Sequence, residues 1–267
     1  MKDWSFSSLS HSIQVRFLAK EFTRFRSFVN INSISLEFLE CSSQRSLLDV
    51  LDLCQAQKTL EHLEIHGITS SMISVFVTGC RVLKSIRIVS ADLQNSLPII
   101  YQAKSTLRDL SLCVVSDIPS SKLQSGFRTL KRLHLQNCSG IGTKQILPLI
   151  QDAPLRTLIL QEIEVVQGIL PFCLRVENVW ISTRRQVCLT ELDFLIRQSD
   201  SLRYLWIEGA LLLSISQLEN IVNQSTSIVK LCLKDILDFR KIAVSSHPKI
   251  CMPCNCTFRE PQSFWKL

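Results

Sequence analysis

A short aliphatic phrase recurs nine times along the chain at nearly even spacing. Each copy has aliphatic residues at its first, fourth and sixth positions, as in Leu130, Leu133 and Leu135. The first positions fall at residues 31, 60, 83, 107, 130, 155, 176, 202 and 228, which gives about 25 residues per repeat, a period typical of stacked repeat proteins. Such a period restricts the chain to architectures in which each unit packs mainly on its neighbours.

Each phrase predicts a short strand, and the residues between phrases predict helices. Alternate residues of a strand point to opposite faces, so the aliphatic residues of a phrase share one face. Between phrases the apolar residues take helical spacing, as at 146–150 and 189–196. Units of this kind are typical of the leucine-rich repeat. We therefore predict an α/β fold, a leucine-rich-repeat solenoid (horseshoe) with a parallel concave sheet and outer helices.

Three segments are expected along the chain. Residues 1–27 are predicted to form an N-terminal helical cap, in which Phe17, Leu18, Phe22 and Phe25 belong to an amphipathic helix over the end of the repeat core. Residues 28–247 are predicted to form the leucine-rich-repeat domain of about nine repeats. Residues 248–267 form a cysteine-rich C-terminal tail. With only 7 Gly and 8 Pro in the chain, no flexible linker is expected.

The sequence favours an intracellular protein, cytoplasmic or nuclear. The first residues lack the pattern of a signal peptide, and no apolar run is long enough to span a membrane. Most of the 11 cysteines are scattered singly through the repeats, where thiols serve as small apolar side chains. An odd number of cysteines without a compact framework argues against a disulfide scaffold. No membrane partner is therefore expected.

One repeat carries a more specific resemblance. Phrase 130–135 is followed by Cys138 at the position where extracellular repeats usually have asparagine, and then by Ser139, Gly140 and Ile141. This unit resembles the cysteine-containing repeats of intracellular F-box and leucine-rich-repeat proteins. The resemblance implies a substrate-recognition subunit or adaptor of a cullin-type ubiquitin ligase. Its implied partners are a protein client and cullin-ligase components.

A ligase-docking element is harder to identify. The helix predicted near the N-terminus could dock a ligase instead of capping the core, although residues 1–30 are too few for a complete F-box. Residues 227–232 loosely resemble an elongin-binding box, but Ile228 and Leu231 also occupy core positions of the last phrase. We expect these two residues to serve the core.

Searches for catalytic motifs give no candidate. The chain has no H-E-x-x-H pair, no G-x-S-x-G, no Walker A loop and no dinucleotide-binding fingerprint. We therefore predict a nonenzymatic protein with no catalytic residues and no organic cofactor.

The tail contains the one cluster with metal-ligand chemistry. His247, Cys251, Cys254 and Cys256 lie within ten residues and could surround a structural zinc ion. The pattern lacks a second C-x-x-C arm, so a tail without metal is the alternative. This segment also faintly resembles the cysteine-rich tail of PRAME-like leucine-rich-repeat proteins, which are linked to cullin ligases as well.

Charge supports a second hypothesis. The formal net charge of +7 makes acidic partners plausible. The basic residues are dispersed, however, and no arginine-rich or aromatic-interleaved motif is present. A basic leucine-rich-repeat scaffold that binds RNA or chromatin is therefore the alternative function.

The strand phrases also predict a binding surface. Residues between the second and third aliphatic positions point away from the core and stack from repeat to repeat, which places Ile159, Trp180 and Trp206 side by side with Tyr204 in the next row. Exposed aromatic clusters mark contact sites. The predicted partner-binding residues are Ile159, Trp180, Tyr204, Trp206, Arg132 and His134. In the alternative, the C-terminal segment folds back and covers the rings.

Overall fold

The structure is a computed structural model that describes part of the chain. Its described residues are 12–16, 33–37, 58–66, 77–89, 99–113, 126–138, 143–163, 168–183, 189–209, 220, 223–225, 227–234 and 250–251. The chain divides into two compact units, Met1–Leu107 and Arg108–Leu267. We call them unit 1 and unit 2 and describe each by itself.

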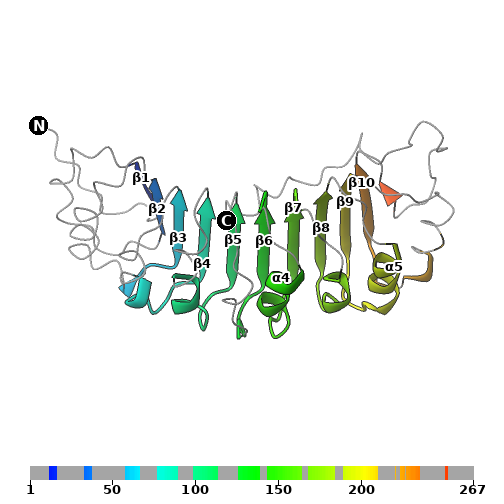
Figure 1. Ribbon diagram of the computed structural model, residues 1–267, viewed down its shortest axis with the longest axis horizontal. Helices are drawn as coiled ribbons and strands as arrows, with labels where there is room; N and C mark the ends of the chain where they lie inside the picture. The colour runs from blue at the N-terminus through cyan, green and yellow to red at the C-terminus, as the bar shows by residue number, and fades with distance from the viewer. Residues whose placement is uncertain are drawn as a thin grey trace, which may run out of the picture. The chain divides into compact units, whose positions relative to one another are not determined.

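The described residues of unit 1 include four parallel strands that pair in chain order (Figure 1). They are β1 (Ser12–Arg16), β2 (Ser33–Glu37), β3 (His62–His66) and β4 (Ser85–Val89). In β3 and β4 the burial alternates, because Leu63, Ile65, Ile86 and Ile88 are buried while their neighbours are partly exposed.

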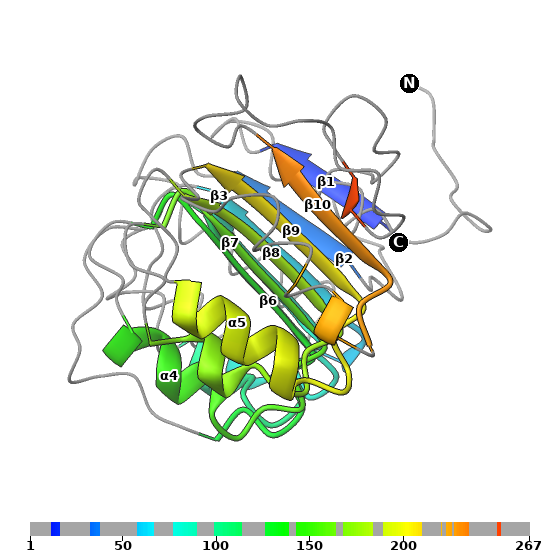
Figure 2. The ribbon, with the colours of Figure 1, turned by 90° about the vertical axis from the view of Figure 1, so that its right-hand side faces the viewer.

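In unit 2 the described part of the chain forms seven parallel strands, also paired in chain order. They are β5 (Asp109–Cys113), β6 (Arg132–Gln136), β7 (Thr157–Gln161), β8 (Asn178–Thr183), β9 (Tyr204–Gly209), β10 (Lys230–Lys234) and β11 (Ile250–Cys251). The helices of this unit whose bounds are described are α4 (Thr143–Ile150), the short 3-10 helix η4 (Leu170–Phe172) and α5 (Leu189–Gln198). Figure 2 shows α4 and α5 on one side of the strands β6–β9. None of the described helices is long and apolar enough to cross a membrane.

The predicted register is confirmed. Each of the nine phrases contains a strand that begins two residues after its first aliphatic residue. In unit 2, Leu110, Leu133, Leu158, Val179 and Leu205 are partners on successive strands, and all are buried. This aliphatic row is the core between the sheet and the helices.

Two strands were not predicted. β1 lies inside residues 1–27, where we expected a helical cap, and the alternation of Ile13 and Val15 with polar residues explains why a strand forms there. β11 lies inside the predicted tail and pairs with β10. The helix expected after residue 16 and most of the tail lie outside the described residues. The boundaries of these end segments stay predictions.

Cys138 satisfies backbone groups in the turn after its strand, as asparagine does at this position in extracellular repeats. Its buried thiol donates to the backbone carbonyls of Leu112 and Gln136, at sulfur–oxygen distances of 3.4 and 3.3 Å. A thiol is a weak donor, but it satisfies carbonyl groups at the point where the chain leaves β6. The cysteine is therefore a structural part of the turn.

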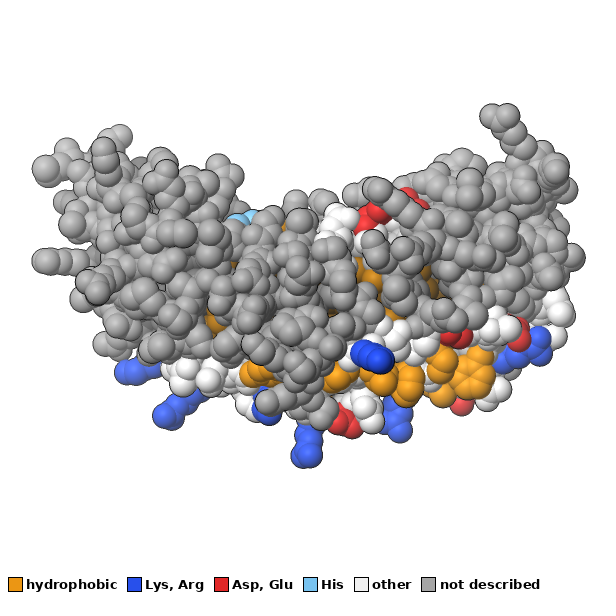
Figure 3. All heavy atoms as spheres, viewed as in Figure 1, with side chains coloured by type: hydrophobic (Ala, Val, Ile, Leu, Met, Phe, Trp, Pro, Cys, Tyr) orange, Lys and Arg blue, Asp and Glu red, His pale blue; other side chains and the backbone are white. Residues whose placement is uncertain are grey.

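A backbone hydrogen-bond ladder joins the repeats at the N-terminal ends of the strands. The carbonyl just before one strand accepts the two N–H groups at the start of the next, as Arg108 does from Lys131 and Arg132 at 2.7 and 2.9 Å. Glu61, Lys131, Arg156, Glu177 and Arg203 repeat this arrangement. Many of these residues are charged. Figure 3 shows Lys and Arg side chains projecting along the lower edge, where the strands begin.

Candidate functional site

The candidate site lies on the face of the unit 2 sheet that is opposite to the aliphatic core, which we call the second face. Six successive strands each place one side chain in register on this face: Ser111, His134, Ile159, Trp180, Trp206 and Cys232. This row, which we call the central row, contains the predicted neighbours Ile159, Trp180 and Trp206. Neighbouring strands lie about 4.8 Å apart, so adjacent members of the row are in contact range.

The aromatic part of the row is a stacked pair. Trp180 and Trp206 lie with their ring centroids 4.3 Å apart and an angle of 15° between the ring planes. Tyr204 belongs to the next row of β9 and pairs in register with Asn178 and Lys230. Tyr204 and Trp206 are both partly exposed. The structure therefore brings the predicted aromatic residues together.

The predicted exposure is wrong for part of this patch. Ile159 is only 4% exposed and Trp180 only 6%. Trp180 stands between Ile159 and Trp206 in the row, and the strand spacing leaves little room for water at its ring faces. Of the predicted patch residues Ile159, Trp180, Tyr204 and Trp206, the last two keep accessible aromatic surface, and we call these two residues the aromatic edge.

His134 is also buried, at 4% exposure, and is held in a hydrogen-bonded chain. Its Nδ1 lies 3.1 Å from Ser111 Oγ and its Nε2 lies 2.9 Å from Gln161 Oε1. An amide oxygen can only accept, so Nε2 carries a proton. These bonds satisfy groups that would otherwise be buried without partners. His134 therefore fixes the row instead of offering a free ring to a partner.

The contact between Ser111 and His134 pairs a hydroxyl with an imidazole, as hydrolytic sites do. Ser111 is fully buried, with 0% exposure, so no substrate reaches its hydroxyl. The pair is a structural element of the sheet.

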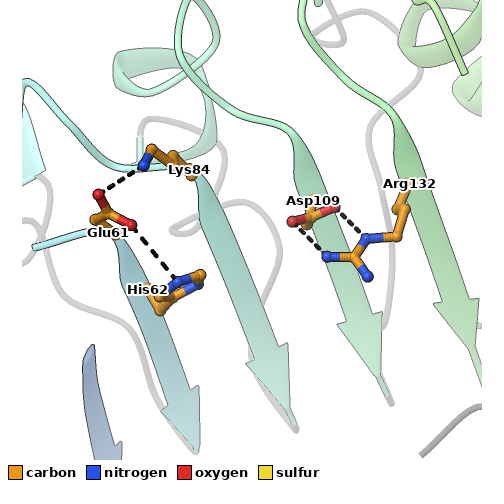
Figure 4. Close-up of polar contacts among 5 residues, drawn as sticks. All are labelled: Glu61, His62, Lys84, Asp109 and Arg132. Carbon is orange, nitrogen blue, oxygen red and sulfur yellow. Dashed lines mark hydrogen bonds and ion pairs between the residues drawn. The ribbon is translucent and has the colours of Figure 1, made fainter. Parts of the chain in front are cut away.

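Arg132 is engaged within the protein. Its Nε and Nη2 donate to the two carboxylate oxygens of Asp109 on the neighbouring strand, the second at 2.9 Å (Figure 4). The hydrogen bond with Asp109 raises the pKa of Arg132, attraction to the carboxylate acts in the same direction, and burial acts against both. Asp109 is nearly buried. The predicted role of Arg132 in a partner contact thus competes with this ion pair.

Unit 1 presents different chemistry on the corresponding residues of β3 and β4. The carboxylate of Glu64 lies 3.4 Å from Arg87 Nε and 3.0 Å from His66 Nε2. Lys84 donates to Glu61 at 2.6 Å, and His62 lies 3.9 Å from the same carboxylate (Figure 4). All these side chains are about one-third exposed or more open. These residues form a polar, partly solvated surface, in contrast to the buried row of unit 2.

The remaining predicted sites have different outcomes. The zinc ligands His247, Cys254 and Cys256 lie outside the described residues, and only the backbone of Cys251 is described, in β11. Within the described ranges, no group of His, Cys, Asp or Glu could hold a metal ion. Ile228 and Leu231 are fully buried, so they serve the core as expected from their positions in the last phrase.

Sequence reasoning missed Asp109, Ser111 and Gln161 as partners in this site. A signal was present, because Asp109 and Arg132 occupy the same position of successive phrases, two residues after Leu107 and Leu130. Aligning the phrases position by position would have paired the two charges.

Comparison with known proteins adds information on the fold. No protein-family model matches the chain, and no curated protein matches it. Among solved structures, the chain is similar to a chain in the crystal structure of the Rad7 and Elc1 complex in yeast, with a TM-score of 0.50 and 12% identity over 91% of this chain and 80% of that chain. At this identity the likeness concerns the fold alone. Together with the strand register it confirms an α/β leucine-rich-repeat solenoid.

Proposed function

We propose that this chain is a nonenzymatic protein-binding solenoid that recognises a protein client for a cullin-type ubiquitin ligase, as a substrate-recognition subunit or adaptor. The observation that carries the proposal is the aromatic edge, Tyr204 and Trp206. The ring of Trp180 on the adjacent strand stacks on Trp206. Tyr and Trp are the residues most enriched among interface hot spots. The proposed place of action is the cytoplasm or the nucleus.

The packing of the aromatic edge suits a binding role. The Trp180–Trp206 stack limits the freedom of Trp206 before any partner arrives, so less conformational entropy is lost on binding. The buried chain of Ser111, His134 and Gln161 holds the same row of the sheet in place. A preorganised aromatic surface on a rigid sheet fits recognition of a folded or extended protein segment better than catalysis.

Two observations support the ligase part of the proposal. The unit around Cys138 resembles the cysteine-containing repeats of F-box and leucine-rich-repeat proteins, and its thiol has a defined structural role. One solved structure with a similar fold is a complex of Rad7 with a second protein, Elc1. By analogy, we propose that this chain also works with an adaptor protein while its sheet holds the client.

Affinity purification of the full chain tests this function. We expect purification from cell extract, quantified by mass spectrometry, to enrich cullin-ligase components together with a client. Trp206→Ala should lose the client and keep the ligase components, because the proposal assigns only client binding to the aromatic edge. Phe172→Ala, which removes an aromatic ring that is 51% exposed on η4, is the matched control and should keep both.

Other results would overturn the proposal. Recovery of no cullin-ligase component above a tag-only control contradicts the ligase role. Equal retention of the client by Trp206→Ala and Phe172→Ala contradicts the role of the aromatic edge. Salt-sensitive nucleic acid in place of both protein classes would favour the alternative, a basic scaffold that binds RNA or chromatin.

A further inference from the structure

A row of basic residues lies at the N-terminal edge of the unit 2 sheet. Arg108, Lys131 and Arg156 stand immediately before β5, β6 and β7, and all three are exposed. Arg128 is a fourth exposed cation, three residues before Lys131. We call these four residues the basic row. It lies at the end of the sheet where the strands begin.

The backbone holds these cations at regular spacing. The N–H of Lys131 donates to the carbonyl of Arg108 at 2.7 Å, and the N–H of Arg156 donates to the carbonyl of Lys131 at 2.8 Å. The three residues are therefore direct neighbours on successive repeats, about one strand spacing, or 4.8 Å, apart at the backbone. Three successive repeats of unit 2 thus each present one cation at this edge.

Most of this charge is not neutralised. Within the described part of the chain, Arg108, Arg128 and Lys131 have no acidic partner in an ion pair, whereas Arg156 has a loose one, Glu177, at 3.7 Å. Arg132 beside them is already committed to Asp109. Like charges on neighbouring strands repel one another. A bound polyanion would therefore stabilise the row, because its negative charge offsets this repulsion.

The chemistry of the row indicates which polyanion fits. Arginine and lysine bind phosphate through charge-assisted hydrogen bonds, and arginine does so with two parallel bonds. Next to Arg128 in the chain the aromatic ring of Phe127 is buried, so it offers no exposed face beside the cations. A platform for unstacked bases is therefore missing from these residues, whereas contacts to a sugar–phosphate backbone need only cations.

We propose that the basic row binds the phosphate backbone of a nucleic-acid duplex without sequence preference. This binding is separate from client recognition, because it uses the edge of the sheet where the strands begin and not the aromatic edge. Regularly repeated phosphates match a regular row of cations better than an acidic protein segment does, since such a segment normally also needs apolar contacts. The expected affinity is weak, with Kd of about 1–100 µM at physiological salt.

Two matched double variants of the full chain test the proposal. Lys131→Gln with Arg156→Gln removes one lysine and one arginine from the basic row. Lys144→Gln with Arg197→Gln removes the same charges from exposed positions on α4 and α5 in the same unit. Binding to a random-sequence DNA duplex is measured by fluorescence anisotropy over a range of salt concentrations. Circular dichroism checks that both variants keep the wild-type melting temperature, as exposed substitutions should.

The salt dependence distinguishes the outcomes. The slope of log K against log salt should become shallower by about 1.8 in the row variant, about 0.9 for each lost phosphate contact, and change little in the helix variant. Equal changes in both variants would show attraction by net charge alone and overturn the proposal. Absence of duplex binding at low salt would also overturn it. If polyglutamate binds as tightly as the duplex and displaces it, the row is a site for acidic protein segments and the proposal is wrong.

Discussion

Trp180 and Trp206, on adjacent strands of unit 2, stack with their ring centroids 4.3 Å apart, yet only Trp206 keeps part of its surface open to solvent. The buried ring supports the accessible one. This division of roles means that substitutions of the two residues should act differently. Loss of Trp180 removes packing within the row, whereas loss of Trp206 also removes surface that a partner can contact.

The aliphatic core predicts a large effect for Leu133→Ala. Leu133 is fully buried between Leu110 and Leu158 in the core row, so its truncation loses burial and leaves a cavity. The free energy of unfolding should fall by about 2–5 kcal/mol. Urea denaturation followed by circular dichroism measures this change. Lys131→Ala, two residues away and exposed, is the control and should change it by less than about 0.5 kcal/mol. A near-neutral result for Leu133→Ala would contradict the register.

Two ion pairs predict contrasting effects on stability. Arg132→Ala leaves the nearly buried carboxylate of Asp109 without its guanidinium partner and should cost about 1.5–3 kcal/mol. Lys84→Ala breaks the pair with Glu61, in which both side chains are more than one-third exposed, and should cost at most about 1 kcal/mol. Urea titration of both variants gives the comparison. If both variants lost the same free energy of unfolding, burial of Asp109 would not strengthen its ion pair.

Burial of two thiols predicts how stability depends on alkaline pH. Desolvation raises the pKa of Cys80 and of Cys173 from 9.0 to about 12. Below pH 9 both thiols are protonated in the folded and unfolded chains, and their contribution to stability is fully present. Above pH 9 the unfolded chain ionises first, so this contribution is lost progressively up to about pH 12.

The measurement compares wild type with a variant carrying both Cys80→Ala and Cys173→Ala. Between pH 9 and about 11 the free energy of unfolding should fall further in the wild type than in the variant, because only the wild type has these thiols. Parallel pH profiles would mean that the two thiols are accessible to water in the folded protein.

The histidine and cysteines of the tail predict a bound zinc ion. A zinc ion held by His247, Cys251, Cys254 and Cys256 would couple the order of the tail to metal binding. Protein purified without added metal should contain about one equivalent of zinc by elemental analysis, and Cys251→Ser with Cys254→Ser should contain none. Zinc below about a tenth of an equivalent in the wild type, with stability unchanged by chelator, would rule out the site.

Much of the fold could be predicted because a repeat reveals itself by its period. Leu133 and Leu158 occupy the same phrase position, so the spacing that identifies one strand identifies the next. β1 was missed because its alternating residues Ile13 and Val15 lie upstream of the first complete phrase. β11 has only two residues, Ile250 and Cys251, too few to form a pattern.

The site was predictable in position but not in exposure. Strand alternation places Trp180 and Trp206 on the face away from the core, and the repeat makes them neighbours. Strand alternation predicts the face on which a side chain lies. It does not predict how much of that side chain its neighbours cover, because this depends on tertiary packing. Trp180 therefore proved buried, and His134 proved to be bonded to Ser111 and Gln161.

The most direct test of the account is the affinity of the purified client for Trp206→Ala. Titration calorimetry of wild type, Trp206→Ala and the control Phe172→Ala against the client recovered by affinity purification gives three dissociation constants. We predict that Trp206→Ala weakens binding by at least about 2 kcal/mol, or roughly 30-fold, as loss of a hot-spot ring does. Phe172→Ala should bind like the wild type, and all three should melt at similar temperatures. Equal affinities for Trp206→Ala and Phe172→Ala would contradict the claim that the client docks on the aromatic edge.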